Sequence, residues 1–214
     1  MAGAGSIPAM THLGLSADEV LSTTRSVRRR LDLERPIDPE LIDECLRLAV
    51  QAPTSEGHEN WHFVVVTDPE QRRALGDCYR AAWADYLNEP PPTEEIPDEP
   101  RSRWFARIIH DVPVMVLPCI EGRPEGGSSG DLAALYGSIV QAGWSFQLAA
   151  RERGLGSVWT TFHLDYERRA AEALGIPYDS VTQVALIPVA HTLGTSFKPG
   201  RRRPMSEVVH RDRW

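Results

Sequence analysis

Residues 52–66 constrain the fold of this chain more than any other segment. They read APTSEGHENWHFVVV, in which His58, Glu59 and His62 form the HExxH string of zinc hydrolases. In those enzymes both histidines bind the metal from one face of a helix, and the glutamate is the general base. A functional string therefore requires a helix here, whereas an accidental string does not.

The composition of the same segment predicts a strand. Residues 61–66 are mostly aromatic and β-branched, and such residues favour a pleated sheet. His62 then lies in a strand, where two residues four apart do not share the face that a helix would give them. No further histidine follows at the spacing of the extended protease motif. We expect a strand near residues 62–67, and a zinc hydrolase built on the string remains a remote alternative.

Length and charge narrow the class of protein. The chain has 214 residues, enough for one domain with a substantial core, and its net charge of −7 argues against nucleic acid or an anionic membrane as the main partner. No apolar run approaches the roughly 20 residues that a membrane span needs. The three cysteines, Cys45, Cys78 and Cys119, form no CxxC pair, and no apolar signal core follows the first Met. We expect a cytoplasmic protein with reduced thiols.

Capping signals predict where several helices begin. Ser16 and Glu19 form a capping box, and Asp38-Pro39 and Asp68-Pro69 each open a helix. The remaining apolar patterns predict helices over 131–153 and 166–174 and strands over 112–120, 157–161 and 181–190. These elements give an α+β class, with a central mixed or antiparallel sheet covered by helices.

The segments outside these elements have distinct compositions. Residues 1–13 are small and unpatterned, so we expect a mobile N-terminal segment ahead of a single domain over residues 14–214. Residues 88–100 contain five Pro and five acidic residues, which predicts a surface loop or a lid. Isolated aromatic and imidazole side chains are assigned structural roles: Trp83, Trp104 and Trp144 in packing, and His110 and His163 as hydrogen-bonded imidazoles.

Two arginine clusters in an acidic chain predict a site for a specific anion. One cluster spans residues 25–30 and the other residues 201–203. The planar guanidinium group matches phosphate, and Ser26, Thr54 and Ser55 could add hydroxyl groups for a phosphate and polyol. The Gly154-Leu155-Gly156 sequence follows a helix rather than a strand, so it does not match a dinucleotide fingerprint. It either ends the helix or lets the backbone approach a flat ligand.

The chain resembles the FMN-dependent nitroreductases over nearly its whole length. The resemblance rests on the order and spacing of several motifs, which are Arg25-Ser26-Val27-Arg28, Ala52-Pro53-Thr54 with Trp61, residues 154–161 (GLGSVWTT), residues 174–178 (LGIPY), Phe197-Lys198-Pro199 and the closing residues 201–210. It implies a nitroreductase-like fold and an intertwined homodimer, with two flavins at the subunit interface. NADH or NADPH would pass hydride to the flavin N5, and a small electron-poor acceptor such as a nitroaromatic or quinone would then take it. The HExxH string is then coincidental.

The resemblance also implies which residues bind FMN. The phosphate would be held by the arginine clusters and Ser26, the ribityl and ring edge by the loop after Pro53, and the region of N5 by the backbone near Thr160. The expected cofactor-binding residues are Arg25, Ser26, Arg28, Pro53, Thr54, Ser55, Gly57, Glu59, Trp159, Thr160, Thr161, Arg201 and Arg203. No side-chain acid or base is required, because the flavin carries the hydride.

One departure from the family pattern has chemical consequences. Where the family usually has an Asn and then a Gln before the Trp, this chain has Gly57 and Glu59. A carboxylate near the flavin would disfavour the negative charge of the reduced ring. We therefore keep two alternatives to a broad reductase: a specialised member that dehydrogenates its substrate or degrades flavin, and a non-catalytic flavin-binding protein.

Overall fold

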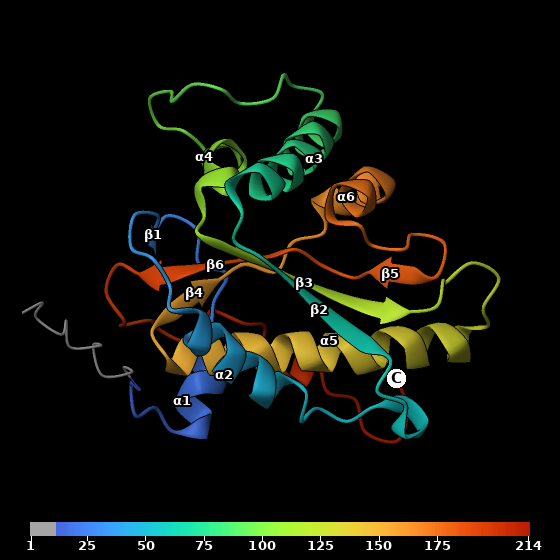
Figure 1. The fold of residues 1–214 in the computed structure, drawn as a ribbon. Helices are drawn as coiled ribbons and strands as arrows, with labels where there is room; N and C mark the ends of the chain where they lie inside the picture. The colour runs from blue at the N-terminus through green and yellow to red at the C-terminus, as the bar shows by residue number, and fades with distance from the viewer. Residues whose placement is uncertain (1–11) are drawn as a thin grey trace, which may run out of the picture.

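A six-stranded sheet lies between two layers of helices (Figure 1). The computed structural model describes residues 12–214, so the mobile segment predicted for residues 1–13 falls almost entirely outside the described residues. The helices are α1 (Ala17–Thr23), α2 (Pro39–Ala49), α3 (Pro69–Leu87), α4 (Arg101–Ile108), α5 (Ser129–Glu152) and α6 (Glu167–Leu174). The strands are β1 (Leu31–Asp32), β2 (Trp61–Val66), β3 (Val114–Glu121), β4 (Leu155–Ser157), β5 (Val181–Gln183) and β6 (Ile187–Thr192). Helices α3, α4 and α6 lie on one face and α1, α2 and α5 on the other, which confirms the predicted α+β class.

The predicted capping residues begin three of these helices. The Ser16 hydroxyl accepts a hydrogen bond from the Glu19 backbone N–H, and the Glu19 carboxylate accepts one from the Ser16 N–H at 2.8 Å. Asp38 and Asp68 each accept a hydrogen bond from the N–H two residues later, at 3.0 and 2.9 Å. Each carboxylate or hydroxyl satisfies a backbone donor that has no partner inside its own helix.

Strand β3 is the centre of the sheet. It is buried along its whole length except at Glu121, and it pairs antiparallel with β2, β5 and β6. Its side chains alternate between the two faces, so that Leu117 belongs to the core under α3 and α4 and Val116 to the core under α2 and α5. His62 lies in β2 and pairs with Cys119 of β3, which confirms the strand predicted for the end of the HExxH string.

The single strand predicted over residues 181–190 is interrupted. From Val116 to Cys119 strand β3 advances three positions, whereas their partners Ile187 and Gln183 are four apart. The extra residue is accommodated by a β-bulge between β5 and β6. The bulge lies opposite Pro118, which has no N–H to donate; its carbonyl accepts from the Val184 N–H at 2.9 Å.

Strand β4 begins and ends two to four residues earlier than the predicted strand over residues 157–161. Gly154 adopts a left-handed conformation with φ 71°, so the chain leaves α5 and enters the sheet at once. The ladder stops after Ser157 because the Val158 N–H reaches the Pro188 carbonyl at 3.2 Å, and Pro188 cannot return a hydrogen bond. The chain pairs once more where Thr160 and Leu186 exchange backbone hydrogen bonds.

Helix α4 was not predicted from the sequence. It follows the mostly exposed segment 88–100, and its N-cap Pro100 makes no side-chain capping bond. The helix is held instead by buried Glu99, whose carboxylate pairs with Arg103 and with Arg107. These three residues recur every four positions, a helical spacing that could have revealed the helix.

His163 does not have the hydrogen bonds predicted for it. Its side chain is fully buried in the η3 turn (Phe162–Tyr166), and neither ring nitrogen has a partner within residues 12–214. Burial lowers the pKa of His163 to about 3, so the ring is neutral near pH 7. His110 is also incompletely bonded, because its Nδ1 is buried without a partner while its Nε2 lies 3.5 Å from Asp111.

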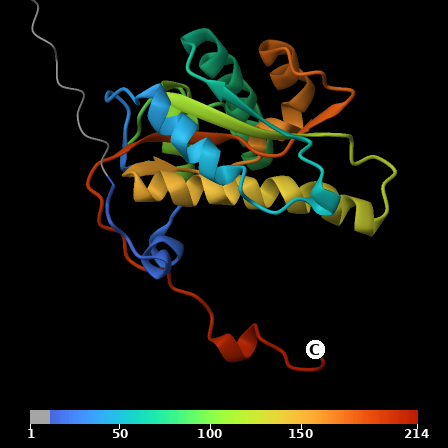
Figure 2. The same cartoon turned by 60° about the horizontal axis from the view of Figure 1, so that its bottom comes forward.

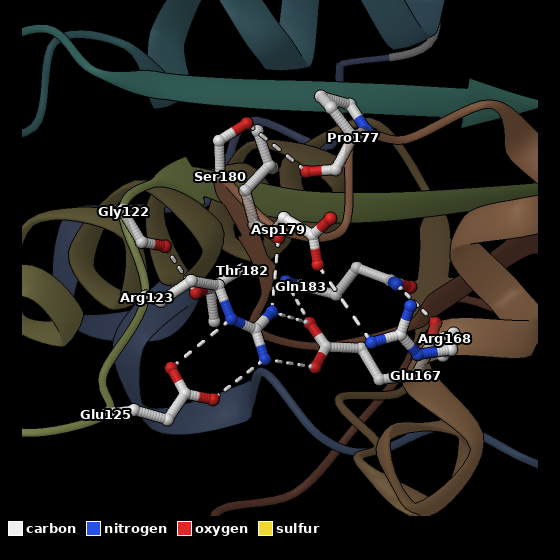
Figure 3. Close-up of polar contacts among 11 residues, drawn as sticks. Gly122, Arg123, Glu125, Glu167, Arg168, Pro177, Asp179, Ser180, Thr182 and Gln183 are labelled. Carbon is white, nitrogen blue, oxygen red and sulfur yellow. Dashed lines mark hydrogen bonds and ion pairs between the residues drawn. The ribbon is translucent and has the colours of Figure 1, made fainter.

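The loop that leads into α5 is held by Arg123 (Figure 3). The Arg123 guanidinium donates to both carboxylate oxygens of Glu167, at 2.9 and 3.0 Å, and to both of Glu125. It also lies 4.4 Å from the ring centroid of Tyr178. Glu167 in turn accepts a hydrogen bond from the Gln183 N–H at 3.0 Å. One partly buried cation thereby joins this loop to the start of α6 and to β5.

Within the C-terminal segment, residues 193–214, residues 193–198 are bonded to the body through Arg30 and Arg25, and the chain beyond residue 200 leaves the body of the protein (Figure 2). Every residue from 201 onward is exposed, including Met205, Val208 and Trp214. Within the described residues, no helix combines the length and the apolar character needed to cross a membrane.

The Arg123 network predicts unequal effects of two similar substitutions. Glu167→Gln should lower the free energy of unfolding by about 1–3 kcal/mol. The substitution replaces the buried carboxylate partner of Arg123 by a neutral amide, and only the exposed carboxylate of Glu125 then remains. Glu125→Gln should leave stability unchanged, since Glu125 is exposed. Urea denaturation of both variants measures this, and equal effects would contradict the role assigned to Glu167.

Candidate functional site

A cavity of about 570 Å³ lies where the N-terminal segment, α5 and the C-terminal segment meet. Its walls combine hydroxyl, guanidinium, amide and aromatic groups. The lining residues are Thr24, Arg25, Ser26, Val140, Trp144, Gln147, Trp159 and Arg202. Three of the predicted cofactor-binding residues, Arg25, Ser26 and Trp159, are therefore brought together here.

One end of the cavity is cationic. Arg25 donates hydrogen bonds to the carbonyls of Thr24, Ser22 and Lys198, the last at 3.0 Å, so it ties the root of the C-terminal segment to the body. That tie brings Arg202 to the same cavity. Arg25, Arg202 and Ser26 thus line the same cavity, and their guanidinium and hydroxyl groups are a donor set that matches a phosphate group.

Arg202, rather than Arg201 or Arg203, lines the cavity. Adjacent side chains of an extended segment point in different directions, so only some of three consecutive arginines can face one site. The sequence identified the cluster but not which member lines the cavity. All three arginines are exposed, and the Arg202 Nη1 donates to the Arg201 carbonyl at 3.0 Å.

The remaining basic residues of the first cluster serve another purpose. Arg28 does not line this cavity; its guanidinium carbon lies 5.6 Å from the ring centroid of Phe105. Arg29 donates to the Glu99 carbonyl and lies over the ring of Trp104. Both arginines therefore attach the segment at residues 88–108 to the first cluster.

The aromatic wall of the cavity depends on a glycine. Trp159 is half-buried and packs against α5 at Gly143, where a Cβ atom would lie 2.6 Å from the ring atom Cζ3. Trp144, predicted to serve only in packing, stays 42% exposed and lines the same cavity. Gln147 is buried and donates from Nε2 to the Ser157 hydroxyl at 3.0 Å. Helix α5 thus supplies one side of the cavity, which the sequence did not indicate.

Thr160 and Thr161 directly follow Trp159 in the chain. Thr160 is buried, with its N–H donating to the Leu186 carbonyl at 3.0 Å, and its side chain is a hydrogen-bond partner of Tyr79. Burial raises the pKa of Tyr79, so the phenol stays protonated near pH 7. Thr161 is exposed.

The predicted residues of the 53–59 loop lie apart from the cavity. Pro53, Thr54, Gly57 and Glu59 do not line it, and the Ser55 N–H is bonded to the Ser138 hydroxyl of α5 at 2.9 Å. Ser138 and Gln147 are nine residues apart on α5, roughly 13 Å along its axis. In this single chain the loop therefore meets α5 close to Val140, at the far end of the cavity from Gln147 and the cationic end.

The zinc interpretation lacks the geometry it needs. His58 follows the short η1 turn (Ser55–Gly57) and His62 lies in β2, where its Nε2 is 3.1 Å from Glu121. The two histidines share no helix face. Among the side chains that the structure describes, no group of three or more His, Cys, Asp or Glu is placed to hold a metal ion.

The cavity fits a phosphorylated aromatic cofactor by its chemistry. The paired arginines and Ser26 suit a phosphate, and the rings of Trp144 and Trp159 suit a flat apolar group. A buried arginine with an unpartnered nitrogen, Arg151, lies beside the cationic end. A phosphate and a conjugated ring would thus both find complementary groups.

Comparisons with known proteins agree with this chemistry. A sequence profile described as Nitroreductase family matches residues 21–191. The chain is 26% identical over 202 residues to a Methanothermobacter thermautotrophicus protein provisionally named NADH dehydrogenase/NAD(P)H nitroreductase, covering 92% of this chain and 86% of that protein. It is 28% identical over 193 residues to the iodotyrosine deiodinase of Thermotoga neapolitana, covering 89% and 95%. Among solved structures, a BluB-like flavoprotein from Clostridium difficile superimposes with a TM-score of 0.69 at 18% identity, covering 94% and 100%.

The contact between Gly143 and Trp159 can be tested against a second glycine of α5. Gly143→Ala and Gly137→Ala gain the same helix propensity, but an added Cβ at Gly137 meets nothing within 4 Å. We expect Gly143→Ala to be about 1–3 kcal/mol less stable than Gly137→Ala, because the Trp159 ring must move. Urea denaturation followed by tryptophan fluorescence measures the difference; equal stabilities would show that Trp159 is not held by this contact.

Proposed function

Because the chain belongs to the nitroreductase family and is an oxidoreductase of that flavin-dependent, NAD(P)H-using class, we propose that it binds FMN and reduces a small electron-poor acceptor, a nitroaromatic compound or a quinone. The observation that carries the proposal is the cavity in which Arg25, Ser26 and Arg202 meet the aromatic wall of Trp144 and Trp159. When bound, the flavin would accept hydride from the nicotinamide and deliver it to the acceptor.

The residues of the chain would bind and orient the flavin. Arg25, Ser26 and Arg202 would hold the phosphate, since two guanidinium groups and a hydroxyl supply several charge-assisted hydrogen bonds. Trp159 would support the ring, and the backbone at Thr160 and Thr161 would lie along its reactive edge. The bond between Tyr79 and Thr160 would keep that edge fixed against α3. No acid or base in the chain is assigned a proton transfer.

A second candidate is reductive dehalogenation of a halogenated phenol. It is favoured by the similarity to the Thermotoga deiodinase, which extends over most of both chains. The departure at Gly57 and Glu59 agrees with a specialised substrate, as the sequence alone suggested. The acceptor also distinguishes these candidates from the flavin-degrading and non-catalytic alternatives, because only a reductase consumes NAD(P)H in proportion to an added acceptor.

The proposed function predicts a yellow purified protein that releases FMN on denaturation. NADH or NADPH should be consumed steadily with menadione or a nitrofuran, whereas steady consumption only with 3-iodotyrosine would favour the second candidate.

Arg202→Met should weaken FMN binding about tenfold, since it removes a charge-assisted contact to phosphate. Arg201→Met is the matched control and should leave affinity unchanged. A protein that takes up no FMN would refute the proposal.

We also propose a homodimer in which a second copy completes each site. The C-terminal segment is exposed and carries Val208, Val209 and Trp214, and the cavity wall exposes Val140 and Trp144. A second copy would bury these exposed apolar side chains, which is favourable because it removes apolar surface from water. The 53–59 loop does not line the cavity of its own chain, so a second copy would bring it to the flavin.

Light scattering should give twice the mass of the chain. Deletion of residues 205–214 should lower the dimer fraction, because it removes exposed apolar side chains that would otherwise be covered by the second copy. Deletion of residues 1–11 provides a control for loss of a chain end. A full-length protein that is monomeric at micromolar concentration would contradict the dimer.

A further inference from the structure

Two arginines lie over one phenylalanine close to the cationic end of the cavity, and Arg25 lies nearby. The guanidinium carbons of Arg30 and Arg151 lie 4.2 and 4.9 Å from the ring centroid of Phe197. Arg25, Arg151 and Phe197 line a small space of about 10 Å³. Within the described part of the chain, none of these three arginines forms an ion pair with a carboxylate.

Two of the three donate hydrogen bonds to neutral carbonyls, and Arg25 keeps further N–H groups for a ligand. Arg30 donates to the carbonyls of Leu193, Gly194 and Ser196, at 2.7 to 3.0 Å. Arg25 donates to three further carbonyls, as described above. Carbonyl oxygens satisfy the donors but do not cancel the charge. The cluster therefore keeps its positive charge.

Arg151 is the exceptional member of the cluster. The residue is 6% exposed, its Nε has no hydrogen-bond partner, and its Nη2 makes a single long bond of 3.3 Å to the Thr23 hydroxyl. The charge of the neighbouring Glu152 favours the charged form of Arg151, but the two form no ion pair, and the Glu152 carboxylate accepts hydrogen bonds from the Gly14 and Leu15 N–H groups. Burial lowers the pKa of Arg151. A buried guanidinium without an acid partner is costly unless an anion accompanies it.

The position of Arg151 near the end of α5 explains the charge only in part. A cation in the last turn of a helix is favourable because of the helix dipole. Arg153 already supplies a cation at that helix end, since it donates a hydrogen bond to the Ala149 carbonyl at 3.2 Å and pairs with Glu44 at 3.0 Å. The Arg151 group instead lies against Thr23 and Phe197.

The small space beside Arg151 adjoins the main cavity. The two share Thr24, Arg25 and Gln147 in their walls, so a ligand held at Arg25 lies close to Arg151. A volume of about 10 Å³ holds roughly one water molecule. Only this small space and its lining residues lie between Arg151 and a group bound in the main cavity.

We propose that Arg151 is a phosphate-positioning residue, whose buried charge, which forms no ion pair, attracts the phosphate of the cofactor and, through Phe197, couples its binding to docking of residues 193–203. The inference rests on the proposed function for the identity of the ligand, a phosphomonoester. Without an anion, the charge of Arg151 opposes folding. With a phosphate at Arg25 and Arg202, that charge becomes favourable, and Phe197 and the segment that follows it are held against the body.

The test compares three variants by two measurements, the dissociation constant for FMN and the thermal midpoint of the apoprotein with and without inorganic phosphate. Arg151→Met removes the charge and keeps the length of the side chain, and Arg151→Lys keeps the charge. Arg153→Met is the matched control on the same helix end. Sodium chloride at equal ionic strength separates phosphate binding from general screening.

The proposal predicts a pattern that a purely structural arginine would not give. Arg151→Met should raise the FMN dissociation constant about tenfold and abolish the rise in midpoint caused by phosphate, without lowering the midpoint of the apoprotein. Arg151→Lys should retain most of both effects. Arg153→Met should lower the apoprotein midpoint, since it breaks an ion pair, yet keep the response to phosphate.

The two proposals fail in different ways. If the wild-type protein binds FMN and Arg151→Met binds it equally well, the role of Arg151 is refuted while the proposed function stands. A lower apoprotein midpoint in Arg151→Met with an unchanged phosphate response would show a structural role only. If the wild type binds no FMN but its phosphate response requires Arg151, the proposed function fails and the anion site remains; a wild type that does not respond to phosphate refutes the anion site.

Discussion

Strand β3 and the proline at its centre determine where the candidate site forms. β3 pairs with β2, β5 and β6, and the cores on both faces of the sheet include its side chains. Opposite Pro118, which cannot donate a hydrogen bond, the partner strand bulges, and beyond Val184 the residue Leu186 pairs with Thr160. That pairing fixes the segment from Ser157 to Thr161, with Trp159 against α5. The wall of the cavity therefore rests on the strand pairing beside the bulge.

Local chemistry made much of the fold predictable. Ser16, Asp38 and Asp68 are short polar side chains that accept hydrogen bonds from the next turn, so they signal helix starts without help from distant residues. The sequence failed where tertiary contacts decide. Helix α4 is held by Glu99 and by burial of residues such as Phe105, and the bulge before Ile187 depends on the proline of another strand.

The sequence predicted which kinds of residue form the candidate site, but not how they are placed in space. The arginine clusters and Ser26 were identified, because such a concentration of guanidinium groups in an acidic chain requires an explanation. The sequence did not show which arginines line the cavity, since Arg28 and Arg29 lie over aromatic rings of α4 and Arg202 is the member of the second cluster that lines it. The contribution of α5 was hidden for a different reason: its apolar residues surround the helix, so periodicity could not separate a cavity wall from the core.

The exposed stripe on α5 also bears on how the site is closed. Val140 and Trp144 are four residues apart, so they lie on the same face of the helix, and both line a cavity open to solvent. Hydride transfer from a bound flavin requires that water be excluded from the reacting face. In the proposed dimer a two-fold axis places the same surface of each copy against the other, so a patch that is apolar in one chain meets an apolar patch in the second. The stripe would then close the site from both sides, while the cationic end at Arg25 stays within one chain.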